Sequence, residues 1–169
     1  MLKGAAYGNN AYGKASLGYL ALKDMLGDAA FGKALHAFMD RWNGKHPIPW
    51  DFFNTVNDVT GTDLNWFWKA WYFSNGYIDL SIGTPSKTAR GYSVAVENIG
   101  GMPAPFDVIV HYADGSDATV HKAAAVWKTD LHQTTLAIPA TKSVRSMTID
   151  GGIWMDADTT NNTWPARSK

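Results

Sequence analysis

The stretch KHPIPWDFFNTVNDVTGTDLNWFWKAW, residues 45–71, decides the fold of the first half of this chain. It holds four tryptophans and three phenylalanines in 27 residues. Pro47 and Pro49 are excluded from a helix interior but suit the start of a helix. Gly61 is a typical helix stop, and Thr62 is suited to cap the next helix. The stretch therefore predicts two successive short helices that carry a dense set of aromatic side chains.

Two more amphipathic helices are predicted upstream of this stretch. Apolar residues recur at helical spacing over residues 15–26, and Gly27 provides a stop. Asp28 is suited to cap a following helix that ends near Asn43–Gly44. The last helix of the set, residues 64–72, is apolar around most of its circumference, which is typical of a helix buried or docked on two sides. The first half therefore predicts a bundle of about four helices.

After residue 76 the periodicity changes from that of helices to that of strands. Asp114–Gly115 lies between two strand-like runs and is a strong hairpin signal. Turn residues recur about every 8–15 residues with no helix between the runs, which favours a small antiparallel sandwich. We therefore predict an α+β chain with a helical bundle at 1–80 and an antiparallel immunoglobulin-like β-sandwich at 81–169. The six strand-like runs cover 77–82, 92–98, 106–112, 118–121, 134–138 and 144–150.

Composition excludes several classes of protein. The 15 Lys and Arg residues equal the 15 Asp and Glu residues, and no basic cluster occurs, which argues against nucleic acid as a partner. No apolar run approaches the roughly 20 residues that a membrane-spanning helix needs. The first ten residues, MLKGAAYGNN, lack the apolar core of a signal peptide. Both a cytoplasmic and an exported, periplasmic location are compatible with this sequence.

The sequence predicts no catalytic metal centre within this chain. It contains no cysteine, and Glu97 is its single glutamate. Zinc hydrolases with an H-E-x-x-H motif need a Glu as general base beside two His ligands. Here no His is followed by Glu. We therefore expect no cofactor bound by these residues alone.

Several short motifs in the helical half occur in a fixed order. They are Tyr12-Gly13-Lys14, then Phe31, Leu35 and Phe38, then Lys45–Pro49 with Asp51-Phe52-Phe53, then Gly61–Leu64. Together they resemble the end of the catalytic domain in zinc aminopeptidases of the aminopeptidase N and leukotriene-hydrolase type, which are gluzincin metallopeptidases. The stretch YSVAVENIGGMPAPFDVIVHYADGS, residues 92–116, is similar to the β-sandwich that follows that domain in many members.

The resemblance implies a fragment of a larger hydrolase of peptide bonds. Residues 1–80 would be the helical C-terminal part of a thermolysin-like catalytic domain. The tyrosine at position 12 would donate its phenolic O–H to the oxyanion of the tetrahedral intermediate, and Tyr7 matches a second active-site tyrosine of some members. The zinc and its ligands would belong to a catalytic domain upstream, alongside an N-terminal β domain. We therefore expect the chain to be inactive alone, with a peptide as the substrate of the whole enzyme.

Other interpretations of the aromatic residues stay open. Tyr12 also fits a packing or capping tyrosine beside a helix start. The cluster at 66–71 suits either a sugar-stacking platform or, as we favour, a core or interdomain contact. The sandwich is alternatively a non-catalytic binding module that uses Trp127 or Trp154. A further alternative is a domain-docking scaffold, for which the apolar helix at 64–72 predicts an exposed patch and therefore self-association.

Two groups of polar residues carry weaker alternatives. His46 fits a structural role in the KHPIP turn. His111 and His121 flank the predicted hairpin, where a solvent-facing pair is favoured over a cross-strand zinc pair. The residues Asp156, Asp158 and Asn161 have a calcium-like spacing without the central Gly and terminal Glu of a calcium loop, and Asx turns account better for them.

Overall fold

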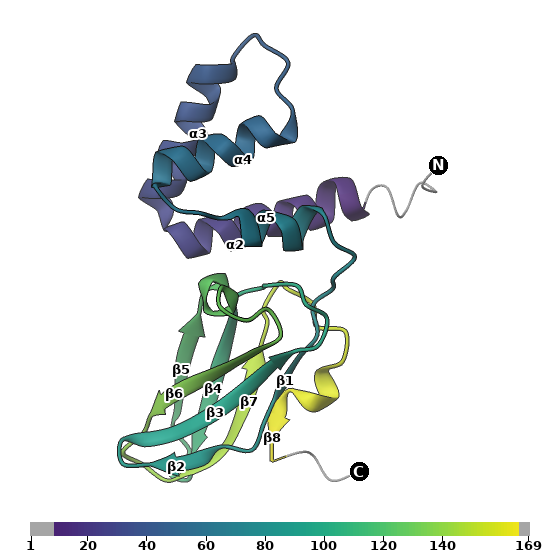
Figure 1. The fold of residues 1–169 in the computed structure, drawn as a ribbon. Coiled ribbons are helices and arrows are strands. Elements are labelled where there is room, and N and C mark those ends of the chain that lie inside the picture. Colours follow the sequence, from purple (N-terminus) through teal and green to yellow (C-terminus); the bar gives the residue numbers. More distant parts are fainter. Residues whose placement is uncertain (1–8, 166–169) are drawn as a thin grey trace. The chain divides into compact units, whose positions relative to one another are not determined.

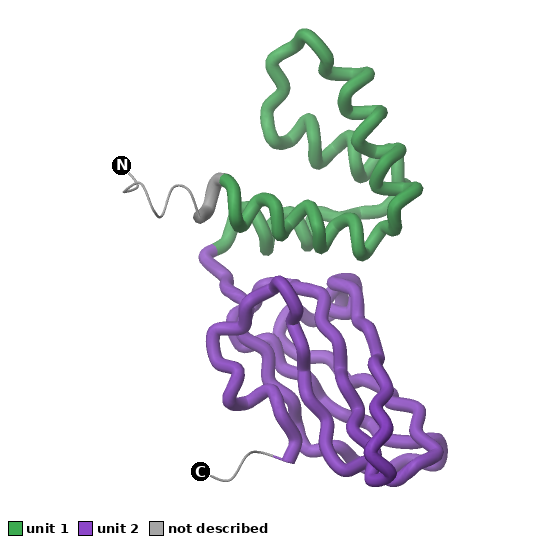
Figure 2. Tube along the Cα trace, turned by 180° about the vertical axis from the view of Figure 1, so that it is seen from behind, with its two compact units in different colours: residues 1–74 green, residues 75–169 purple. Residues whose placement is uncertain are grey.

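The fold was analysed in a computed structural model, which describes residues 9–165 and the side chains from residue 12 onward. The chain divides into two compact units, Met1–Ser74 and Asn75–Lys169 (Figure 2). Unit 1 is helical, and unit 2 consists of antiparallel sheets. The predicted fold class, an α+β chain with a helical part followed by a β-sandwich, is confirmed.

Unit 1 contains a short π-helix followed by four α-helices (Figure 1). All four α-helices agree with the sequence periodicity. Gly27 and Gly61 end two of them with positive φ angles of 77° and 62°, a conformation that glycine adopts without steric cost. The elements are η1 (Asn9–Lys14), α2 (Ala15–Leu26), α3 (Asp28–Trp42), α4 (Pro49–Thr60) and α5 (Asn65–Tyr72).

The helix starts are only partly as predicted. Pro49 is the first residue of α4, and the Ile48 N–H donates to the Asp51 carboxylate over 2.8 Å. Thr62 does not cap α5, because the helix begins three residues later and its first N–H, that of Asn65, donates to Asp63 Oδ1 over 2.9 Å. Asp28 is not a cap either, since it lies inside α3 and pairs with Lys23 at 3.3 Å.

Aromatic side chains of α4 and α5 form the core of unit 1. Phe53 stacks on Trp68 with ring centroids 4.7 Å apart, and Phe67 and Trp71 are almost fully buried. The Trp68 indole N–H donates to Asn57 Oδ1 over 3.0 Å, so its polar edge is paired. The dense aromatic stretch therefore lies mainly in the core, as favoured from the sequence. Rings that are buried in this way are not available to stack on a sugar.

Unit 2 is built of two four-stranded antiparallel sheets. In the first sheet β3 is central, with β1 and β2 along one side and β6 along the other. The second has the order β5-β4-β7-β8. The sequence analysis did not predict β2 and β8, because strands of three and two residues are too short to show a periodic pattern. The strands are β1 (Leu80–Ile82), β2 (Ser86–Thr88), β3 (Gly91–Asn98), β4 (Phe106–Tyr112), β5 (Asp117–Lys122), β6 (Gln133–Pro139), β7 (Val144–Asp150) and β8 (Thr163–Trp164).

Alternating side chains of the strands fill the core of unit 2. In β4, every second residue from Phe106 to Tyr112 is buried. The 3-10 helix η2 (Ala124–Trp127) adds Trp127, which is fully buried and whose Nε1 donates to the Ala104 carbonyl over 2.9 Å. Most sheet residues that face inward are therefore apolar, as a sandwich requires, and the fully buried Asn98 of β3 is a polar exception.

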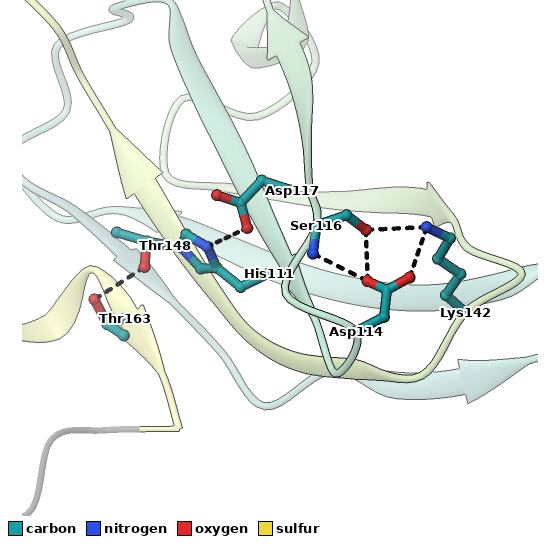
Figure 3. Close-up of polar contacts among 7 residues, drawn as sticks. All are labelled: His111, Asp114, Ser116, Asp117, Lys142, Thr148 and Thr163. Atoms are coloured by element: carbon teal, nitrogen blue, oxygen red, sulfur yellow. Dashed lines mark hydrogen bonds and ion pairs between the residues drawn. The ribbon is translucent and has the colours of Figure 1, made fainter.

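The β4–β5 hairpin forms at the predicted Asp114–Gly115. Gly115 has φ of 84°, and the Tyr112 N–H donates to the Ser116 carbonyl over 2.9 Å. Figure 3 shows the Asp114 carboxylate accepting from Ser116 and pairing with Lys142 at 2.8 Å. Hydrogen bonds from Lys142 and Ser116 hold the pKa of Asp114 well below its usual range. This hairpin is therefore fixed by polar contacts at its tip.

Candidate functional site

Tyr12, the residue to which the resemblance assigns a catalytic role, lies in η1 at the start of the described chain. The residue is 70% exposed in the described structure. Tyr7 lies outside the described residues. The structure therefore places one of the two predicted site tyrosines, on a short π-helix that continues directly into α2.

A polar contact ties the junction of η1 and α2 to the end of α5. The Lys14 ammonium donates to the Ser74 carbonyl over 3.2 Å. Partial burial lowers the pKa of Lys14 because the surrounding protein disfavours its charged form. Sequence reasoning had no means of finding this contact, since its partners are 60 residues apart.

Close helix packing also holds the start of α2 on α5. Gly18 of α2 is buried, and a Cβ built there would lie 2.8 Å from the Tyr72 hydroxyl oxygen. Burial, and secondly the nearby Tyr19, raise the pKa of Tyr72 far above its ordinary value. The absence of a side chain at Gly18 therefore allows α2 to approach α5, and this approach fixes the direction in which η1 leaves the bundle.

The chemistry available around Tyr12 is hydrogen-bond donation. A neutral phenol aimed at a developing oxyanion stabilises a transition state more than the ground state. Within residues 9–165, no group of three or more His, Cys, Asp or Glu side chains is arranged to hold a metal ion. Catalytic zinc requires three protein ligands, usually of these types. The described residues therefore do not fit a catalytic zinc centre.

A groove of about 570 Å³ lies between α3 and α4. Asp40, Lys45 and Asp51 line it, and Arg41 pairs across it with Asp58 at 2.5 Å. The ion pair uses one nitrogen of the half-exposed Arg41 guanidinium. Tyr12 is not among its lining residues, so this groove is separate from the predicted site.

The histidines of unit 2 form cross-strand pairs with aspartates. His111 Nδ1 lies 2.8 Å from Asp117 Oδ1, as Figure 3 shows, and His121 Nδ1 lies 2.6 Å from Asp107 Oδ1. Each pair joins residues directly opposite in the β4–β5 register. The two histidines therefore belong to different pairs, and the cross-strand zinc pair does not form. His46 is exposed in the loop before α4.

The Asx turns expected near the C-terminal end are confirmed. The Asp158 N–H donates to Asp156 Oδ1, and the Thr160 N–H donates to Asp158 Oδ1, each over 2.9 Å. The second Asp156 oxygen accepts from the Leu80 N–H at the start of β1. This contact brings Asp156 beside Asp79, a buried carboxylate that sequence reasoning missed because it lies inside an apolar run, Ile78–Leu80.

Comparison with known proteins gives a match in structure but not in sequence. No family model and no curated protein matches the sequence. The structure is similar to that of Legionella pneumophila aminopeptidase A, solved in complex with aspartic acid, with a TM-score of 0.57 and 17% identity. This chain has an aminopeptidase-like fold. The similarity covers 78% of this chain, which is more than either unit alone, so it includes residues of both units.

This chain matches only a small part of the Legionella enzyme. The similarity covers 16% of that enzyme's chain, so most of the larger protein has no counterpart here. At this level of identity the likeness concerns the fold alone. None of the helices in the described part of the chain combines the length and the hydropathy that a bilayer crossing requires.

Proposed function

We propose that this chain is the C-terminal portion of a zinc-dependent aminopeptidase of the gluzincin type, which hydrolyses N-terminal peptide bonds. The observation that carries the proposal is the aminopeptidase-like fold across both units, together with the Tyr12-Gly13-Lys14 motif on η1. The zinc ligands and the general base would come from residues outside this chain. The chain alone is then expected to be inactive.

In the proposed enzyme, Tyr12 stabilises the oxyanion by donating its phenolic hydrogen. Its exposure in this chain is consistent with a side chain that meets a substrate held by another part of the protein. Lys14 and Gly18 position the residue, the first by binding the Ser74 carbonyl and the second by close packing on Tyr72. Tyr7 is proposed as a secondary contributor.

The test is a Tyr12→Phe substitution in the longer protein that contains this chain. Losing one oxyanion donor lowers kcat by about 10²–10³-fold. The assay follows release of the chromophore from aminoacyl-anilides, with acidic residues included in the substrate panel. Tyr19→Phe is the matched control, because Tyr19 is a partly exposed tyrosine of the same helical unit within α2. A Tyr12→Phe protein with unchanged kcat contradicts the proposed role.

A second assay tests directly whether the isolated chain lacks a zinc site of its own. The isolated chain is supplied with zinc and the same anilides, and no turnover above background is expected. Robust turnover by this chain, abolished by a chelator, would show that its own residues bind the metal. That result would refute the assignment of the zinc site to another part of the enzyme.

A second candidate function is domain docking through an apolar patch on unit 1. Ile48, Trp50 and Phe73 are each more than half exposed, and the Trp50 and Phe73 ring centroids lie 4.7 Å apart. Exposed aromatic clusters of this kind commonly mark contact sites. The non-catalytic alternative in the sandwich is weaker, because Trp127 is fully buried and offers no binding surface. Concentration-dependent sedimentation, lost in Trp50→Ser, would support the docking role, whereas a strict monomer would count against self-association.

A further inference from the structure

Three loops meet at the end of unit 2 where β2 turns into β3 (Figure 1). They are the β2–β3 turn, the β6–β7 connection and the tip of the β4–β5 hairpin. The Ala140 N–H donates to the Arg90 carbonyl over 3.3 Å, which joins the first loop to the second. The Ala113 N–H donates to the Ser143 carbonyl over 2.9 Å, which joins the second loop to the third. Backbone hydrogen bonds therefore hold the three loops side by side.

The β2–β3 turn also lies directly against the end of β6. Gly91, the first residue after the turn, pairs with Pro139 in the β3–β6 register. A Cβ built at Gly91 would lie 2.2 Å from the Ile138 carbonyl oxygen and 2.5 Å from the Ala140 nitrogen. No side chain fits at this position, so the close approach of the two backbones depends on the glycine. The arrangement of the first two loops is therefore set by the backbone.

These loops border a cavity of about 380 Å³ that is rich in basic side chains. Lys87 of β2, Arg90 of the turn and Lys142 of the β6–β7 connection line it, and the hydroxyls of Thr88 and Thr141 add neutral donors. No acidic side chain is among the described residues that line it. The whole chain has equal numbers of basic and acidic residues, so this lining is a local concentration of positive charge.

Two of the three cations lack a compensating carboxylate. The Lys142 ammonium pairs with Asp114 at 2.8 Å and donates to Ser116 Oγ over 3.0 Å (Figure 3). Lys87 and Arg90 take part in no ion pair within the described part of the chain. Two positive charges therefore remain open to an external anion, whereas the third is held by the hairpin tip.

We propose that this cavity binds a phosphate group, either as the free ion or as part of a small ester, with Arg90 and Lys87 as its charged ligands. The planar guanidinium of an arginine donates two parallel N–H bonds to two phosphate oxygens, and a lysine adds a second charge without fixed geometry. A phosphate dianion matches two uncompensated cations in charge. The cavity volume lies within the range of small-molecule sites, roughly 300–1,000 Å³.

The competing account is that both side chains are simply solvated. β2 lies along one side of its sheet, and a lysine on such a strand commonly protects an open edge from pairing with another chain. This account requires no ligand. The two accounts differ in one measurable respect, because a built site saturates with phosphate, whereas solvated charges respond only to ionic strength.

The experiment is a titration of the full chain with inorganic phosphate and, separately, with phenyl phosphate, at constant ionic strength set with sodium chloride. The backbone N–H signals of Arg90, Thr141 and Lys142 are followed by NMR. They should shift along saturable curves with a Kd on the order of 1 mM, since exposed charge pairs each contribute little. Tighter binding of phenyl phosphate would identify the ligand as a small phosphate ester, and tighter binding of inorganic phosphate would identify it as the free ion.

Two pairs of variants make the result specific to the cavity. Arg90→Gln should raise the Kd about tenfold, because it removes charge-assisted hydrogen bonds. Arg145→Gln is its matched control, since Arg145 is an exposed arginine of β7 outside the cavity lining, and its Kd should stay within about twofold. Lys87→Gln is compared with Lys128→Gln in the same way. All four residues are exposed, so the variants should keep the fold, which the same spectra verify.

Either of two results would overturn the proposal. The first is a set of shifts that do not saturate and that sodium chloride alone reproduces at the same ionic strength, which is the behaviour of solvated charges. The second is a Kd that is unchanged in Arg90→Gln or that rises equally in Arg145→Gln, because phosphate would then respond to the charge of the whole domain and not to this cavity.

Discussion

Gly18→Ala tests whether close packing of α2 (Ala15–Leu26) on α5 (Asn65–Tyr72) positions the predicted site. Two opposing effects set the expected change. Replacing a helix-interior Gly by Ala stabilises a helix by about 1 kcal/mol. The new methyl group, however, would lie 2.8 Å from the Tyr72 hydroxyl oxygen and 3.3 Å from the Trp71 ring, whereas ordinary contacts begin near 3.4 Å. Overpacking of this kind costs about 1–3 kcal/mol, so we expect a net loss of about 1 kcal/mol.

Tyr72→Phe supplies the decisive comparison because it removes the nearest atom. In that background Gly18→Ala should be neutral or stabilising by up to about 1 kcal/mol, since the helix preference then dominates. The double-mutant cycle should therefore show a favourable coupling of about 1–2 kcal/mol between the two substitutions. The free energy of unfolding is measured by urea titration with circular dichroism at 222 nm on the four proteins.

Gly32→Ala is the matched control for this cycle. Gly32 lies inside α3 (Asp28–Trp42), and a Cβ there would meet nothing within 4 Å. It should therefore stabilise unit 1 in both backgrounds by the same amount. The reasoning is refuted if Gly18→Ala has the same effect with Tyr or Phe at position 72, because the hydroxyl contact would then not limit the approach of α2 to α5.

Three further outcomes are expected. The pKa of Tyr72 is higher in the native state than in the unfolded chain, so the stability contributed by this buried phenol is present below about pH 10 and is lost as pH rises further. In Tyr72→Phe, the urea midpoint should therefore fall less with rising pH above about pH 10 than it does in the unsubstituted protein. Trp127→Phe should destabilise unit 2 by about 1–3 kcal/mol in the same titration, because the buried Ala104 carbonyl loses its donor, and a smaller effect would contradict this account. The pKa of Asp114 is lowered by Lys142 and Ser116, so its stabilising contribution is present above about pH 4 and is lost as pH falls. In Asp114→Asn, the part of the acid-induced loss of stability that is due to Asp114 should disappear. The same decrease of the urea midpoint at acid pH in both proteins would contradict this contribution.

The helices were predictable from sequence because their limits depend on local chemistry. Gly27 and Gly61 end helices in positive-φ conformations that the sequence alone identifies, and Pro49 starts one. The caps were less predictable. The choice between Thr62 and Asp63 depends on where the chain enters α5, which is set by the burial of Leu64 and the rings beyond it rather than by cap preference.

The features that bear on function were harder to predict, since they join distant parts of the sequence. The Lys14–Ser74 contact and the pairing of Leu80 with Asp156 each span 60 residues or more. Nothing local to Asp79 distinguishes it from the exposed aspartates of the chain. Its burial becomes visible only when the residues before the 3-10 helix η3 (Thr159–Asn161) are placed against the start of β1. The proposed role of Tyr12 depends on the order of the motifs in the helical half, and it is tested by the Tyr12→Phe substitution in the longer protein.

The backbone bond between Ala157 and Ile78 anchors the segment before η3, and the chain then continues into β8, which pairs with Met147 and Thr148 of β7 (Figure 1). β8 thus covers part of the outer edge of β7, where unpaired backbone N–H and C=O groups would otherwise be open to a strand of another chain. The short last strand therefore acts as a guard against edge-to-edge aggregation, and cutting the chain before η3 would bare that edge.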